Sequence, residues 1–200
     1  MDELQIESVI KEVSDFNKKA ANKVDNRLAK FLELFNNEFP ENSIVRFKAE
    51  TITWAFLDTV LSLYANGNNS SVIIEIYSII EKFAIRDLPK FLSRNKKVQS
   101  IITDLIERKN LNEIAIFFER IGIWSDNDLI NIKQITKIRN GIAHKSEKLI
   151  AKALNSGKKT HFLEIDSIVK EYDSSQFIII TINLLLKIIF NKKYSNNLKK

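Results

Sequence analysis

The chain has no cysteine. Disulfide frameworks, thiolate nucleophiles and cysteine-based zinc sites are therefore excluded, and the composition suits a reducing compartment, so we expect a cytoplasmic protein. Glycine and proline are also scarce, with 4 and 2 among 200 residues. An all-β sandwich or barrel needs many turns rich in these two residues, so their scarcity favours a helical fold.

We expect neither a leader peptide nor a membrane-spanning segment in this sequence. The first residues, MDELQIESVIKE, are acidic and amphipathic, unlike a signal peptide. The most apolar run, Phe177–Phe190, is too short to cross a bilayer and contains Asn183 and Lys187. We therefore expect no membrane contact and predict that this run is a buried helix.

The composition is otherwise that of a folded globular protein, with 44% hydrophobic and 28% charged residues. A chain of 200 residues can bury a sizeable core in one domain. Repeats and interdomain linkers are not apparent. We predict a single all-α domain over residues 1–200, with a long N-terminal helix over about 1–40 and a helical bundle over about 45–190.

Apolar residues recur in steps of three and four, which is typical of amphipathic helices. The first series ends at Phe39-Pro40, and the second at the turn Asn66–Ser70. The β-branched run after Ser71 also fits a strand, but no partner strand is nearby, so a helix is favoured. The expected helices span about 3–37, 44–64, 71–92, 97–108, 111–121, 125–155 (as one helix or two) and 165–191.

The net charge of +6 is concentrated near the C-terminus. Residues 1–144 hold 20 basic and 20 acidic side chains, whereas residues 145–200 hold 11 and 5. This excess fits either an anionic partner such as RNA or a solubilising tail. Lys145, Lys158 and Lys159 are candidates for contacts with an RNA backbone, although Lys158, Lys159 and His161 also fit a solvated loop.

The segment Lys137–His144, with the sequence KIRNGIAH, carries the candidate chemistry. On a helix, Asn140 and His144 lie one turn apart on one face, whereas Arg139 and His144 diverge by about 140°. Gly141 costs roughly 1 kcal/mol in a helix interior but allows close approach of backbone or ligand. The side chains of Arg139 and His144 therefore converge only if the arginine reaches around the helix or a second chain closes the site.

These residue types suit RNA cleavage. An imidazole exchanges protons near neutral pH, and a guanidinium binds phosphate oxygens and stabilises the charge of a transition state. RNA supplies its own nucleophile, the 2′-hydroxyl, so serine, cysteine or a metal is not required. The alternative is a purely structural role for His144 as a histidine at a helix end.

Metal and cofactor sites have no support in the sequence. His144 and His161 are the only histidines and lack a partner at metal-ligand spacing, and no phosphate-binding glycine motif is present. We therefore expect neither a metal nor a cofactor. Trp54 and Trp124 fit positions in the core or at an interface.

The motif Arg139-Asn140-x-x-Ala143-His144 resembles the Arg-x4–6-His signature of the HEPN superfamily, in the variant in which Asn follows Arg. The helical pattern is similar to that family over roughly residues 45–190. Glu81 resembles the acidic residue that many members carry on a preceding helix, and Glu75 is a weaker alternative. A subgroup has a modifiable Tyr two residues after the His, but this chain has Ser146 there, which puts that form of regulation in doubt.

The resemblance implies a metal-independent endoribonuclease of a toxin–antitoxin or antiviral system, acting as a homodimer whose two motifs line one cleft. Arg139 would stabilise the phosphorane, His144 would be the general acid or base, and Asn140 would orient His144 or the phosphate. Glu81 would either form a buried ion pair with Arg139 or position it for catalysis. Expected partners are RNA, a second copy and an antitoxin protein. Other members are inactive, so the alternative is a helical module that binds a protein or nucleic acid.

Overall fold

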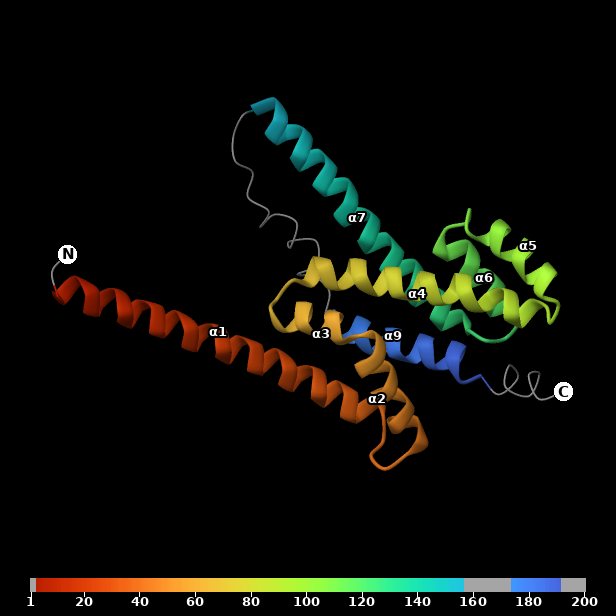
Figure 1. The fold of residues 1–200 in the computed structure, drawn as a ribbon, viewed down its shortest axis with the longest axis horizontal. Helices are drawn as coiled ribbons and strands as arrows, with labels where there is room; N and C mark the ends of the chain where they lie inside the picture. The colour runs from red at the N-terminus through yellow and green to blue at the C-terminus, as the bar shows by residue number, and fades with distance from the viewer. Residues whose placement is uncertain (1–2, 157–173, 192–200) are drawn as a thin grey trace.

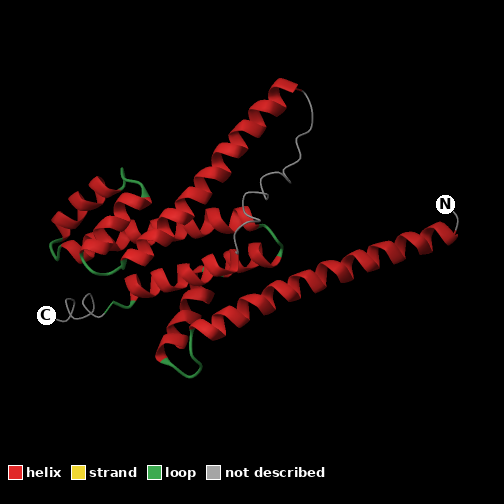
Figure 2. Ribbon diagram, turned by 180° about the vertical axis from the view of Figure 1, so that it is seen from behind, coloured by secondary structure: helices red, strands yellow, loops and turns green. Residues whose placement is uncertain are grey.

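The computed structural model describes residues 3–156 and 174–191, with side chains over 21–144 and 174–191. Every regular element in these residues is an α-helix, and no strand occurs among them (Figure 2). The prediction of an all-α helical bundle is confirmed. The helices are α1 (Glu3–Glu38), α2 (Ile44–Phe56), α3 (Asp58–Ala65), α4 (Asn69–Leu92), α5 (Lys96–Ile106), α6 (Leu111–Arg120), α7 (Asp126–Ser156) and α9 (Ser174–Ile189).

Helix α4 is the centre of the bundle, because it packs against α3, α5, α6, α7 and α9 (Figure 1). Its side chains Val72, Ile73, Ile76 and Ile80 are completely buried. The β-branched run that could also have formed a strand is therefore a helix. Its buried residues cover one broad face, whereas Ile74 and Lys82 on the opposite face are exposed, so α4 is not buried all round as its apolar run suggested.

Helix α7 packs one side against α4 and α6. The residues on this side include Ile132, Ile135, Ile138 and Ile142, which are spaced by three or four positions and are all buried. Ser125 caps the N-terminus of the helix, because its hydroxyl accepts from the Asp128 backbone N–H at 3.3 Å and its own N–H donates to Asp128 Oδ2 at 2.7 Å. The helix continues unbroken to Ser156, so the open choice between one helix and two resolves to one.

A buried carboxylate also joins the start of α7 to α9. Lys187 Nζ lies 2.5 Å from Asp128 Oδ2, and the Ser125 hydroxyl donates to the same oxygen at 2.8 Å. Burial alone would raise the pKa of Asp128, but the hydrogen bonds from Lys187 and Ser125 outweigh it and hold the pKa below its usual value. Asp128 is therefore charged at neutral pH and ties the two helices together.

The core of the bundle includes one of the two tryptophans. The Trp124 ring stacks on Phe118 with centroids 4.4 Å apart, and its Nε1 donates to the Leu184 carbonyl at 3.4 Å. Trp54 differs sharply, because 71% of its surface is exposed. Of the two positions expected for these residues, Trp124 occupies the core and Trp54 does not.

The single helix predicted over 44–64 is wrong. The chain forms two helices, α2 and α3, which are separated at Leu57 with φ −114° and ψ 8°. The Leu57 side chain is completely buried at this break, so the change of direction inserts it into the core. The predicted end of this segment is correct, because α3 stops before Gly67, whose φ of 81° favours glycine.

The first and last helices lie where the sequence predicted them, as far as the structure describes these residues. Helix α1 ends at Glu38, just before Phe39-Pro40. Residues 174–189 of the expected last helix form α9, and residues 165–173 lie outside the described residues. Within the part of the chain that the structure describes, no helix is long and apolar enough to cross a membrane.

Candidate functional site on helix α7

Within the Arg139–His144 motif on α7, Asn140 and His144 lie on the outer side of the helix, whereas Arg139 lies on the side that faces α4. Ile138 and Ile142 are buried, whereas Asn140 and His144 are exposed and Arg139 is half-buried. The buried isoleucines therefore fix the backbone of the motif, while the side chains of Asn140 and His144 are exposed to solvent. This placement follows from the helical period, because Asn140 and His144 are one turn apart.

The guanidinium of Arg139 is held by two neighbours. Its Cζ lies 5.2 Å from the centroid of the Tyr77 ring on α4, and its Nη1 donates to Asn140 Oδ1 at 3.2 Å. A cation over an aromatic face gains attraction from the ring quadrupole. The arginine is therefore oriented by α4 and by its own neighbour in the motif, without a carboxylate partner among these contacts.

The ion pair expected between Glu81 and Arg139 does not form. Glu81 is half-buried and instead accepts a hydrogen bond from the Tyr77 hydroxyl, with the two oxygens 3.0 Å apart. Tyr77 and Glu81 are four residues apart on α4, so the phenol is the nearer donor. Tyr77 thus contacts both residues and connects the carboxylate to the arginine indirectly.

Tyr77 is the residue of this site that the sequence did not reveal. Burial raises the pKa of its phenol, and the charge of Glu81 and the hydrogen bond to it raise the pKa further, whereas Arg139 opposes the shift. The phenol therefore stays protonated and keeps donating to Glu81. The only sequence signal was the four-residue spacing from Glu81, which is common on helices.

Substituting Glu81 with glutamine should lower the pKa of Tyr77 towards its usual value, because the carboxylate charge that opposes phenolate formation is removed. Ultraviolet absorbance during an alkaline titration would measure this change. Subtracting the titration of a Tyr77→Phe variant isolates Tyr77 from the other three tyrosines. Identical Tyr77 curves with glutamate and glutamine would show that the described contact does not govern the phenol.

Of the remaining candidate residues from the sequence, only some lie in the part of the chain that the structure describes. Glu75 is half-buried on α4. Lys158, Lys159 and His161 lie outside the described residues, as do the side chains of Lys145 and Ser146. Among the described residues, no group of three or more His, Asp or Glu side chains could hold a metal ion. The site as described therefore consists of Arg139, Asn140 and His144 on α7, with Tyr77 and Glu81 on α4.

Comparisons of the chain with protein-family models, curated protein sequences and solved structures found no match.

Proposed function

We propose that the protein is a metal-independent endoribonuclease of the HEPN type. The 2′-oxygen of a ribose attacks the adjacent phosphorus, a P–O2′ bond forms, and the P–O5′ bond breaks. A base removes the 2′-hydroxyl proton and an acid protonates the departing 5′-oxygen, which leaves a 2′,3′-cyclic phosphate and a 5′-hydroxyl. The substrate supplies the nucleophile, so the protein contributes charge stabilisation and proton transfer.

Three residues of α7 carry the proposed roles. Arg139 stabilises the negative charge on the phosphorane, and His144 is the general acid or base. Asn140 orients the guanidinium through the 3.2 Å hydrogen bond that it accepts. Tyr77 and Glu81 act behind them as positioning residues, because they contact Arg139 or its aromatic support and not the outer side of α7.

The observation that carries the proposal is the contrast between the two motif side chains. Arg139 is half-buried and oriented by Tyr77 and Asn140, whereas His144 is exposed about one turn further along the helix. A phosphate-binding group benefits from preorganisation, and a proton-transfer group must reach the substrate. A buried His144 packed in the core would instead have supported a structural role.

A second copy belongs to the proposed active form. Arg139 is directed towards α4 while His144 is exposed, so one chain presents them on diverging sides of α7. Two motifs facing each other in one cleft would supply two imidazoles, one to accept the 2′-hydroxyl proton and one to protonate the 5′-oxygen. In a toxin–antitoxin or antiviral system, an antitoxin protein would be a further partner.

Growth inhibition tests this proposal in cells. Expression of the wild type should slow growth, whereas Arg139→Ala or His144→Ala should restore it while the protein stays soluble. His144 is exposed, so its removal should cost little stability, and removal of the half-buried Arg139 should cost about 1 kcal/mol through loss of its contact with Tyr77. Lys133→Ala is the matched control, since Lys133 is exposed on the same helix outside the motif, and it should remain toxic. Equal growth inhibition by wild type and both motif variants would remove the assignment.

The second candidate function is a catalytically silent module that binds a protein or nucleic acid. It is favoured by large apolar side chains that lie exposed on α2 and α5, namely Phe47 (67%), Trp54 (71%), Ile101 (60%) and Leu105 (61%). Exposed patches of this kind mark interaction surfaces. Incubation of pure protein with total RNA separates the candidates, because a silent module leaves the RNA intact and behaves like its His144→Ala variant.

A further inference from the structure

Helix α1 extends beyond the rest of the bundle. Its C-terminal part packs on α3 and α9, and its N-terminal half points away from the other helices (Figures 1 and 2). The sequence of this half places apolar residues in steps of three and four from Ile6 to Ala20. Such a stripe is typical of a helix that packs on another helix, and an isolated helix is only marginally stable in water. The described part of the chain supplies no helix at this position.

An apolar groove adjoins the C-terminal part of the same helix. It has a volume of about 250 Å³ and is lined mainly by Leu28, Leu32 and Phe35 of α1 together with Trp54 of α2 and Leu61 of α3. Leu32 is 51% exposed and Trp54 is 71% exposed. Exposed tryptophan beside an apolar hollow is typical of residues that dominate the energy of a protein interface.

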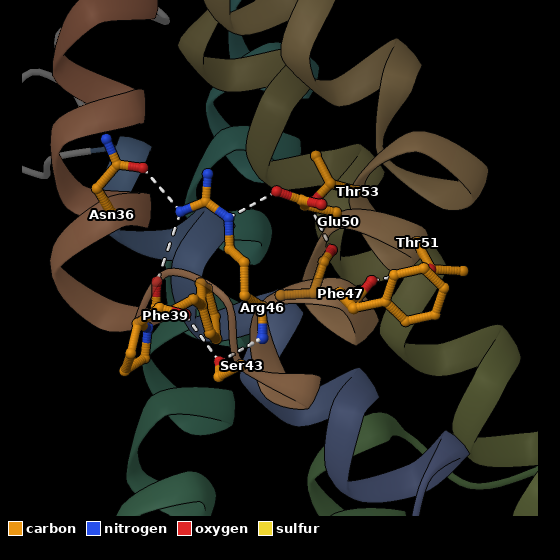
Figure 3. Close-up of polar contacts among 10 residues, drawn as sticks. Asn36, Phe39, Ser43, Arg46, Phe47, Glu50, Thr51 and Thr53 are labelled. Atoms are coloured by element: carbon orange, nitrogen blue, oxygen red, sulfur yellow. Dashed lines mark hydrogen bonds and ion pairs between the residues drawn. The ribbon is translucent and has the colours of Figure 1, made fainter.

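One wall of the groove is fixed by Arg46, which joins the end of α1 to the start of α2 (Figure 3). Its guanidinium donates to Asn36 Oδ1 at 2.7 Å and to Glu50 Oε1 at 2.6 Å, and lies 4.5 Å from the centroid of the Phe35 ring. Its backbone N–H donates to the Ser43 hydroxyl at 3.0 Å. The groove is therefore preformed, which lowers the ordering cost of binding.

The distribution of charged residues along α1 favours one orientation of a second α1 helix packed beside it. Residues 2–15 hold five acidic and one basic side chain, whereas residues 18–30 hold five basic and one acidic. An antiparallel pair of α1 helices places each acidic half beside the basic half of the other copy, and it also opposes the two helix dipoles favourably. A parallel pair would place like charges together. In the antiparallel pair, the N-terminal end of each helix reaches the groove of the other.

We infer that α1 and the adjoining groove form an interface for a second copy of this chain, with the two α1 helices antiparallel. The interface is self-complementary, so it closes as a two-fold dimer. It involves α1, α2 and α3, whereas the Arg139–His144 motif lies on α7. The inference therefore does not depend on the proposed nuclease, and each can fail without the other.

Light scattering on the full chain tests whether the groove is part of a dimer interface. The wild type should have twice the 23.2 kDa mass of one chain at micromolar concentration, or four times that mass where the α7 motifs also pair. Leu32→Glu combined with Trp54→Glu should weaken dimerisation by roughly a hundredfold or more, because charges then enter the apolar contact. Ile101→Glu on α5, which is 60% exposed, is the matched control and should remain dimeric. Circular dichroism verifies that each variant keeps its helices.

Charge reversal tests the antiparallel pairing. One variant carries Glu7→Lys and Glu12→Lys, and a second carries Lys23→Glu and Lys30→Glu. Each alone brings like charges together and should have half the wild-type mass, whereas their mixture restores opposite charges and should recover the wild-type mass as a mixed assembly. A monomeric wild type, variants that all remain dimeric, or a mixture that stays monomeric would each overturn the inference. A wild type of four chains that falls to two in both variants would support it.

Discussion

Replacing His144 with alanine is expected to lower the rate of RNA cleavage by about 10²- to 10⁴-fold, the usual contribution of a positioned acid or base. Arg139→Ala should lower it by about 10²- to 10³-fold, because charge building on the phosphorane loses its stabilising guanidinium. Initial rates on a defined RNA oligonucleotide at neutral pH would give both results.

Two controls separate chemistry from folding in this experiment. Lys133→Ala removes an exposed cation from the same helix and should retain nearly the wild-type rate. Thermal unfolding should show that His144→Ala is as stable as the wild type, because His144 is exposed. An unchanged cleavage rate in His144→Ala at full protein stability would mean that α7 carries no proton-transfer group.

RNA with a single 2′-deoxynucleotide at the cleaved position is expected to resist the enzyme completely. The proposed reaction forms a bond between that 2′-oxygen and phosphorus, so removing the oxygen removes the nucleophile. A 2′-deoxynucleotide several positions away is the control and should leave cleavage unchanged. A nuclease that activates water with a bound metal would still cut the modified position, so cleavage there would exclude the proposed role of the substrate.

Local pattern was sufficient to predict most helices of this protein. Proline at position 40 and the Asn66–Ser70 turn marked real helix ends, and the steps of three and four between apolar residues predicted helices where the structure has them. These features depend on residues close in sequence. The break at Leu57 could not be predicted in this way, because it depends on burial of that side chain against distant helices.

In the candidate site, too, contacts within one helix could be predicted from the sequence, whereas contacts between helices could not. The sequence placed Asn140 and His144 on one exposed face of a helix, and the structure agrees. It could not predict that Tyr77 would lie between Glu81 and Arg139, because that contact joins two helices about sixty residues apart. A carboxylate near an arginine suggested an ion pair, but a phenol one turn away on the same helix as Glu81 took its place.

The chemical identity of the RNA ends tests the central claim most directly. Pure wild-type protein should cut RNA in the presence of EDTA and leave a 2′,3′-cyclic phosphate or 3′-phosphate on one fragment and a 5′-hydroxyl on the other. Mass spectrometry of the fragments would identify these ends, and His144→Ala should yield none of them. Fragments with 5′-phosphate and 3′-hydroxyl ends, or activity lost in EDTA and restored by magnesium, would contradict the chemistry proposed for Arg139 and His144.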